Sequence, residues 1–408
     1  MKKPLDIVVL GLSITSSWGN GHATTYRALL RALAARGHRL LFLERDVPRY
    51  AQARDLPAAP YCEIARYGSL AELGDRFQAR VAGADLVMVG SSIPEGRPVI
   101  DWVQTNARGA VTFYDIDTPV TLARLAADEC AYLARRQVPR FDMYFSFTGG
   151  PSLRRLERTY GAQRARPLYC AVDPAEHFPV AVERRWDLAY MGTYSADRQP
   201  SLHELLMLPG VHDSSLRLAV AGSLYPPDLR WPENVERIEH LPASEHRAFY
   251  AAQRWTLNVT RADMRASGYS PSVRLFEAAA CGVPVITDEW PGIHEFFEPG
   301  REIMVARSCT EMRRLLSLPP EVAVQVGRQA RRRALAEHTA ARRAEYLEAQ
   351  IEFVLARRAR SPRPARIVAA PVVSGAPEPD VPRPVGVKPP VCPPLSQPVP
   401  VPLSSTAD

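Results

Sequence analysis

The sequence predicts an α/β protein with two doubly wound parallel-sheet domains and a disordered C-terminal tail. Short apolar runs alternate with helical patterns through the first 170 residues, as in parallel sheets covered by helices. A second alternation of the same kind follows. The tail, residues 361–408, contains fourteen prolines among its 48 residues and few large apolar groups besides valine. It cannot bury enough surface to offset its chain entropy, so we expect it to be disordered.

The first predicted domain spans residues 1–170 and is Rossmann-like. Its apolar runs predict strands at 7–12, 40–43, 86–90, 110–114, 143–147 and 168–172. Helical patterns lie between them, for example at 24–35, 120–135 and 152–160. Such alternation is typical of a sheet whose ligand sites lie at the carboxyl ends of its strands.

The second predicted domain spans residues 171–340 and is also Rossmann-like. Its strands are expected at 188–191, 216–221, 235–238, 257–260, 283–287 and 303–306. The motif A-V-D-P at 171–174 marks the boundary between the domains. Residues 320–358 are rich in Ala, Arg and Glu and predict long terminal helices, of which the last covers 341–360.

The basic residues are nearly all arginine, although the formal net charge is +7. Lys2, Lys3 and Lys388 are the three lysines, so a P-loop lysine is excluded and phosphate must be bound by arginine, backbone amides or metal. No basic stretch interleaved with aromatic residues occurs in the body of the chain, so we expect no nucleic-acid binding. Arginine runs at 331–333 and 357–366 allow at most peripheral association with a membrane.

The remaining composition indicates an ordinary globular protein. The six cysteines form no C-x-x-C pair, which argues against a zinc knuckle or a disulfide framework. No run approaches eighteen apolar residues, and the apolar N-terminal run is interrupted by Asp6, so we expect a cytoplasmic protein without a signal peptide or membrane span.

The segment 269–289, YSPSVRLFEAAACGVPVITDE, predicts a helix, a tight turn and a buried strand. Ser272 is a candidate helix cap and Gly282 a candidate helix stop. Glu277 stands among small residues that imply close packing, where an unpaired carboxylate is costly unless a partner or ligand accepts it. The alternative is a surface glutamate on an amphipathic helix.

The loop after the first strand is rich in glycine. Gly19, Asn20 and Gly21 would let a ligand approach the backbone closely. Glu44, at the end of the second strand, stands at about the distance that a dinucleotide-binding fingerprint requires. However, Thr24 replaces the third glycine of that motif, and six residues, 13–18, separate the strand from Gly19. A nicotinamide or flavin enzyme is therefore disfavoured.

His22 follows this loop directly, and Asp117 lies at the carboxyl end of a predicted strand. One interpretation is that His22 is a general base oriented by Asp117, because neutral imidazole suits proton abstraction near pH 7. The alternative for His22 is a capping or structural histidine. Asp115 and Asp117 also form a D-x-D motif, which can bind Mg²⁺ or Mn²⁺, or Asp117 can cap the next helix.

Three arginines of the second domain are candidate phosphate-binding residues. The segment YMGTYSADRQP offers an uncrowded backbone at Gly192 and Thr193, with Arg198 close behind. Arg261 ends a strand, and Arg274 lies on the first turn of the helix that carries Glu277. Guanidinium groups bind phosphate oxygens in a bidentate manner, so these side chains could neutralise a diphosphate leaving group.

The pattern R-x-F-E-A-x-A-C-G-x-P-V-x-x-D and the segment G-T-Y-x-x-D-R-Q resemble the GT-B glycosyltransferases of group 1, and the CgeB-like, spore-maturation branch in particular. The resemblance covers roughly residues 5 to 355. It implies a metal-independent transfer of a sugar, hexosyl or related, from a nucleotide-diphosphate donor to a glycan, protein or small molecule. It also implies that the terminal helix packs back on the first domain, and that no cofactor is needed because the nucleotide sugar is a substrate.

By the same resemblance Glu277 binds the ribose, and His22 and Asp117 are catalytic on the acceptor side. The implied donor-binding set is completed by Gly19, Asn20, Gly21, Gly192, Thr193, Arg198, Arg261, Ser272, Val273 and Arg274. No metal ligand is assigned.

One position departs from the family pattern. Many retaining members carry a second glutamate eight residues before the ribose-binding one, and Tyr269 stands there in this chain. The stereochemistry, the base, the sugar and the acceptor therefore stay open. The alternatives are a GT-B nucleotide-sugar epimerase and a non-catalytic scaffold that binds a sugar nucleotide or a polysaccharide.

Overall fold

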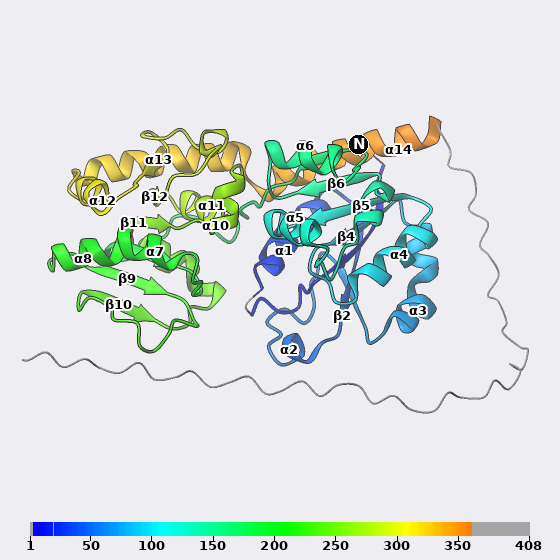
Figure 1. Cartoon of the computed structure of the whole chain (residues 1–408), viewed down its shortest axis with the longest axis horizontal. Coiled ribbons are helices and arrows are strands. Elements are labelled where there is room, and N and C mark those ends of the chain that lie inside the picture. Colours follow the sequence, from blue (N-terminus) through cyan, green and yellow to red (C-terminus); the bar gives the residue numbers. More distant parts are fainter. Residues whose placement is uncertain (1–2, 19, 361–408) are drawn as a thin grey trace, which may run out of the picture. The chain divides into compact units, whose positions relative to one another are not determined.

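A computed structural model describes residues 3–18 and 20–360 of the chain (Figure 1). Gly19 and the proline-rich tail 361–408 lie outside the described residues. The disorder that the sequence predicts for the tail therefore also falls outside them. Two parallel sheets with helices packed on them make up the described part, as the alternating sequence pattern predicts. No helix among these residues is both long and apolar enough to cross a membrane.

The first sheet has seven strands in the order β3-β2-β1-β4-β5-β6-β7, all paired in parallel. The strands are β1 Asp6–Gly11, β2 Arg39–Arg45, β3 Glu63–Tyr67, β4 Leu86–Gly90, β5 Ala110–Asp115, β6 Met143–Ser146 and β7 Ala165–Pro167. Its helices are α1 Gly21–Ala35, α2 Pro48–Ala51, α3 Leu70–Gly83, α4 Gly96–Asn106, α5 Thr118–Ala127 and α6 Pro151–Arg158, with a 3₁₀ turn η1 at Arg135–Arg140. The strand order reverses beside β1, so the loops after β1, β4 and β5 lie together at one edge.

The second sheet has six parallel strands in the order β10-β9-β8-β11-β12-β13. They are β8 Trp186–Met191, β9 Leu218–Ala221, β10 Val235–Ile238, β11 Gln253–Asn258, β12 Val285–Thr287 and β13 Met304–Val305. The helices of this part are α7 Gln199–Leu202, α8 Leu208–His212, α9 His246–Ala251, α10 Ala262–Ser267, α11 Val273–Ala280, α12 Cys309–Leu316 and α13 Pro320–Glu337, with a π-helical turn η2 His203–Met207 and 3₁₀ turns η3 Ala243–Glu245 and η4 Ile293–Glu295. Helix α14 Ala340–Arg360 follows α13.

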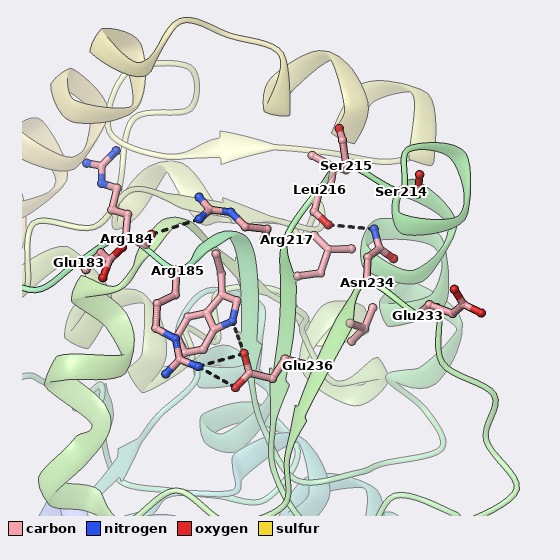
Figure 2. A pocket seen from close by; sticks show the side chains of 13 residues that line it. Glu183, Arg184, Arg185, Ser214, Ser215, Leu216, Arg217, Glu233, Asn234 and Glu236 are labelled. Atoms are coloured by element: carbon pink, nitrogen blue, oxygen red, sulfur yellow. Dashed lines mark hydrogen bonds and ion pairs between the residues drawn. The ribbon is translucent and has the colours of Figure 1, made fainter.

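A surface pocket opens at the amino ends of β8, β9 and β10 (Figure 2). Within it, Arg185 and Trp186 both donate to Glu236. Ligands of open α/β sheets bind at the carboxyl ends of the strands. This pocket is therefore at the wrong end of the sheet for a nucleotide site of the usual kind.

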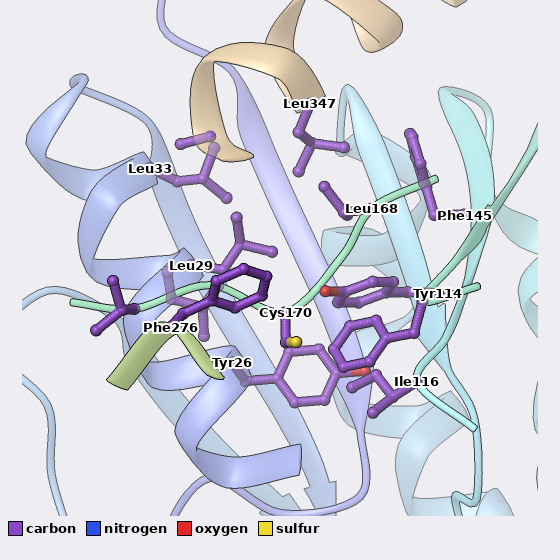
Figure 3. Packing of buried hydrophobic residues seen from close by; sticks show 14 of the residues in the cluster. Tyr26, Leu29, Leu33, Tyr114, Ile116, Phe145, Leu168, Cys170, Phe276 and Leu347 are labelled. Atoms are coloured by element: carbon purple, nitrogen blue, oxygen red, sulfur yellow. The ribbon is translucent and has the colours of Figure 1, made fainter. Parts of the chain in front are cut away.

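One buried cluster joins the first sheet to α11 and to the terminal helices (Figure 3). Phe276 of α11 packs with Tyr26, Leu29 and Cys170, and Leu347 of α14 belongs to the same cluster. Helix α14 packs along α1 and against β5. Polar contacts fix it there, because Glu348 accepts hydrogen bonds from Arg36 and pairs with His38 at 2.7 Å.

Two sequence predictions about elements were wrong. The apolar run 168–172 is not a strand: it follows β7, and Val172 makes only an isolated bridge with Thr339, which lies between α13 and α14. The helix predicted at 120–135 ends at Ala127, since Asp128 adopts a left-handed conformation with φ of 61°. Strand β3 was missed because its polar sequence, EIARY, carries no clear apolar run.

Candidate functional site

The first candidate site lies at the carboxyl edge of the first sheet. The side chain of Asn20 caps α1 by accepting a hydrogen bond from the His22 backbone N–H at 3.1 Å. This places His22 in the first turn, with its Nε2 2.9 Å from Oδ2 of Asp117. Ser92, in the loop after β4, donates to the same Oδ2 at 3.1 Å. Loops after β1, β4 and β5 thus bring one imidazole and one carboxylate together.

The environment of Asp117 favours its ionised form. Burial opposes ionisation, but the hydrogen bonds from His22 and Ser92 and the positive charge of Arg261 outweigh it, so the pKa of Asp117 lies below its usual value. The Nδ1 atom of His22 is buried and has no partner among the described residues. Arg261 follows a strand of the second sheet, so the carboxyl edges of the two sheets interact electrostatically at this point.

Asp115 occupies the neighbouring position but has a different environment. Its Oδ2 accepts from Tyr144 at 2.6 Å and its Oδ1 from Thr121 at 2.7 Å, and the side chain is fully buried. Burial raises the pKa of Asp115 to about 7. A carboxyl group that is partly protonated at neutral pH and enclosed by hydroxyls is a poor metal ligand, so the D-x-D interpretation is disfavoured.

The glycine-rich loop is held by polar contacts. The Nδ2 of Asn20 donates to the carbonyls of Ser13 and Ser16, each at 3.0 Å. Glu44 accepts from the backbone N–H groups of Ile14 and Thr15. Glu44 is therefore used inside the protein, which argues against the ribose contact of a dinucleotide-binding fingerprint. A Cβ added at Gly21 would meet no protein atom within 4 Å, and Gly19 lies outside the described residues.

The second candidate site lies at the carboxyl edge of the second sheet, where two glycines bring backbone segments close together. Gly192 follows β8 and Gly222 follows β9. A Cβ at Gly222 would lie 2.1 Å from the carbonyl oxygen of Gly192, and one at Gly192 would lie 2.5 Å from the hydroxyl of Tyr190. Thr193, next to Gly192, is exposed. Only glycine fits at position 192 or 222, so the backbone of these two residues is bare of side-chain atoms and closely packed.

Three arginines surround this bare backbone. Arg198 donates to the carbonyl of Thr193 at 2.6 Å, and its Nε is buried without a partner among the described residues. Burial lowers the pKa of Arg198, and the positive charges of Arg274 and Arg261 lower it further. The guanidinium groups of Arg274 and Arg261 therefore repel that of Arg198. A bound anion would relieve that repulsion.

Arg274 is fixed more firmly than the other two. It is 8% exposed, its Nε donates to the carbonyl of Met191 at 2.7 Å, and one Nη donates to Oδ1 of Asn258 at 2.8 Å. The guanidinium also lies over the ring of Tyr190, with 5.0 Å from Cζ to the centroid. Arg261 is more exposed and lies 3.9 Å from Asp197.

Helix α11 carries four of the predicted donor-binding residues. Ser272 occupies the N-cap position, but its side chain caps no backbone N–H, contrary to the sequence prediction; its hydroxyl lies 3.4 Å from Arg274 instead. Val273 is the first helical residue. Glu277 is 5% exposed, which rules out a surface glutamate, and its Oε2 accepts from the hydroxyl of Tyr250 at 2.9 Å.

Tyr269 has a structural role at the position where many retaining relatives carry glutamate. Its φ is 51°, and a Cβ added at Gly150 or Gly292 would lie 2.4 Å from its ring. The ring therefore packs between two glycines. The Tyr269 carbonyl accepts from the Gly149 backbone at 2.9 Å, which joins this segment to the loop after β6.

Sequence reasoning missed several residues that contact the predicted ones. Ser92, Asn258 and Tyr250 each hydrogen-bond to a predicted site residue. The sequence positions of Ser92 and Asn258 could have indicated them as site residues, because they stand at or just after strand ends. Tyr250, inside a short helix, gives none. The structure groups the predicted residues into two sets, with His22 and Asp117 at the first edge and the arginines with Glu277 at the second.

Comparison with known proteins supports the same fold. Residues 198–349, less than half of the chain, match the family model described as glycosyl transferase-like. No curated protein matches in sequence. Among solved structures, sucrose-phosphate synthase from Thermosynechococcus elongatus has a TM-score of 0.63 at 16% identity, with 86% of this chain and 100% of that chain covered.

Two further structures are similar. Anabaena HepE in complex with UDP and glucose has a TM-score of 0.63 at 11% identity, covering 85% of this chain and 99% of that one. An α-glucosyltransferase in complex with UDP has a TM-score of 0.60 at 11% identity, covering 85% and 100%. At these identities the likeness establishes the GT-B-like fold.

Proposed function

We propose that the protein is a GT-B glycosyltransferase that transfers a sugar, hexosyl or related, from a nucleotide-diphosphate donor. The observation that carries the proposal is the cluster of Arg198, Arg261 and Arg274 around the bare backbone at Gly192. Departure of a nucleoside diphosphate builds negative charge, and preorganised cations stabilise it. The matched family model and the fold support the same activity.

The donor would lie along the carboxyl edge of the second sheet. Its diphosphate would contact the three arginines, the backbone at Gly192 and Thr193, and the N-terminus of α11 at Ser272 and Val273, where free N–H groups favour an anion. One oxygen of Glu277 is held by Tyr250, and the other would accept from the ribose hydroxyls. The positive charge comes from protein groups, so we propose that transfer requires neither a metal nor a cofactor.

The acceptor would dock at the first edge, near His22 and Asp117. The carboxylate of Asp117 lies 2.9 Å from Nε2 of His22, which suits it to orient the ring and stabilise an imidazolium. His22 would then take the acceptor's proton through Nδ1, after side-chain movement opens that buried atom.

UDP-glucose is the first donor to test, since two of the similar structures are complexes with UDP. The motifs G-T-Y-x-x-D-R-Q and R-x-F-E-A-x-A-C-G support placing the chain in the CgeB-like branch. On the same resemblance we propose a polysaccharide or glycoconjugate as the product class.

A thermal-shift screen of nucleoside diphosphates and their sugars tests the donor site. A ligand at 100 times its dissociation constant stabilises the folded state by about 2.7 kcal/mol. We expect one nucleotide, UDP first, to stabilise the wild type, and Glu277→Ala to lose most of that response. Tyr250→Phe is the matched control, because it removes the hydrogen bond to Glu277 but keeps the carboxylate. The proposal fails if no nucleotide stabilises the wild type or if Glu277→Ala responds fully.

A further inference from the structure

His177, His246 and Glu277 form a cluster of metal-ligating side chains. His177 lies in the segment between β7 and β8, His246 begins α9, and Glu277 lies in α11. One ligand atom from each residue lies within 4.8 Å of the others. The His177 side chain is 11% exposed and that of Glu277 6%, with 3.9 Å between Nε2 and Oε1. Three segments distant in sequence thus converge on one small volume.

Outer contacts orient two of the three side chains. Nε2 of His246 lies 3.3 Å from the carbonyl of Leu241, so it donates there and leaves the lone pair of Nδ1 free. The Tyr250 hydroxyl donates to Oε2 of Glu277 at 2.9 Å and leaves Oε1 facing His177. Histidine ligands of metals usually donate their other ring N–H to a carbonyl or carboxylate, and ligating carboxylates are themselves hydrogen-bonded.

We propose that His177, His246 and Glu277 bind a Zn²⁺ ion. Two imidazole nitrogens and one carboxylate suit zinc, whereas Mg²⁺ and Ca²⁺ prefer oxygen alone. Tetrahedral zinc with bonds of about 2.1 Å holds its ligands about 3.4 Å apart, so small side-chain rotations close the present spacing. Three protein ligands leave the fourth position open to water or another ligand.

The site has a regulatory consequence, which rests on the proposed function. Oε1 of Glu277 is the oxygen left for the ribose, because Tyr250 holds Oε2. Zinc bound to Oε1 would occupy that acceptor and place an ion where the ribose hydroxyls bind. Zinc and the nucleotide therefore exclude one another, and free zinc inhibits transfer.

Titration of the metal-free full chain with Zn²⁺ alone, against a chromophoric chelator, tests the site. We expect the wild type to bind one equivalent of Zn²⁺. The variants His246→Ala and His177→Gln should each bind Zn²⁺ at least tenfold more weakly. His212→Ala, at an exposed histidine of α8, is the matched control and should bind as the wild type does. Co²⁺ in the wild type should give the absorption of a four-coordinate site, and thermal melts without metal verify folding of each variant.

The zinc site is overturned if the wild type binds no stoichiometric zinc or if both histidine variants bind it as tightly as the wild type. Titration of UDP in zinc-buffered solution separates this proposal from the proposed function. Weaker UDP binding at saturating zinc supports the exclusion, and unchanged UDP binding overturns it. If the protein binds zinc stoichiometrically but does not bind UDP, the proposed donor is contradicted and the metal site is supported.

Discussion

The carboxyl edges of the two sheets have the same architecture but opposite chemistry. At the first edge the charged groups are carboxylates, and both are satisfied by protein donors: Tyr144 and Thr121 for Asp115, His22 and Ser92 for Asp117. At the second edge three arginines lie together: burial lowers the pKa of Arg198, the positive charges of Arg274 and Arg261 lower it further, and Asp197 lies 3.9 Å from Arg261. Parallel-sheet topology fixes where loops converge, whereas the side chains in those loops determine what binds there.

The difference indicates that the two edges have different functions. The first edge holds an imidazole beside a carboxylate, whereas at the second edge Asp197 is the one carboxylate paired with any of the three arginines among the described residues, at 3.9 Å from Arg261. Arg261 connects the two, because its positive charge also lowers the pKa of Asp117. Changes at the first edge should therefore affect transfer, and changes at the second should affect donor binding.

Asp117→Asn should have the largest effect. It removes the negative charge beside His22, and general acid–base catalysis contributes roughly 10²- to 10⁴-fold to rates. We expect kcat for sugar transfer to fall within that range while the Kd for UDP stays unchanged. Steady-state kinetics and calorimetric titration of UDP measure the two quantities.

Ser92→Ala is the control for this prediction. It removes the second hydrogen bond to Asp117 but keeps the carboxylate and its pairing with His22. Its loss of kcat should be much smaller than that of Asp117→Asn. Equal losses would mean that the charge of Asp117 is not what matters.

Gly222→Ala should damage the second edge alone. Its Cβ would lie 2.1 Å from the carbonyl oxygen of Gly192, at a φ of 154°, so the backbone must shift. Overpacking typically costs about 1–3 kcal/mol, and we expect a loss of stability of that size together with weaker UDP binding. Gly21→Ala, where a Cβ meets open space, should leave stability unchanged. Chemical denaturation measures the free energy of unfolding of both variants. Equal losses of stability in the two variants would contradict the prediction.

Asp115→Asn should change the pH dependence of stability. Burial raises the pKa of Asp115 to about 7, so the folded protein keeps a proton that the unfolded chain releases from about pH 4 upward. This group therefore contributes stability that is lost as pH rises from about 4 to 7. We expect the Tm of the wild type to fall relative to that of the variant across this range. A difference in Tm that is independent of pH would contradict the assigned burial effect.

Much of the fold follows from the sequence because parallel strands are apolar on both faces. The run 86–90 coincides with β4, and 235–238 with β10. Strand β3 was missed because its residues EIARY carry no clear apolar run. The run 168–172 was misassigned because a buried connection between sheets is as apolar as a strand.

Less of the candidate site follows from the sequence. Strand ends identified Asp117 and Arg261, but nothing in the local pattern indicates that their charges interact, because that depends on how distant loops meet. At position 269 the sequence shows only that tyrosine replaces the glutamate of the family pattern. The packing of Tyr269 between Gly150 and Gly292 depends on two other segments of the chain. Likewise His177 and His246 lie 69 positions apart and become a cluster through tertiary structure alone.

Titration of UDP and uridine into the wild type, Asp117→Asn and the double variant Arg198→Ala/Arg261→Ala tests the central claim most directly. A hydrogen bond to a charged group contributes about 1.5–3 kcal/mol, or roughly tenfold or more in Kd. We predict that the wild type and Asp117→Asn bind UDP equally tightly, and both far more tightly than uridine. The double variant, shown to be folded by its thermal melt, should lose at least tenfold in affinity for UDP and little in affinity for uridine. Unchanged UDP affinity in the double variant would contradict a donor diphosphate site at the second edge.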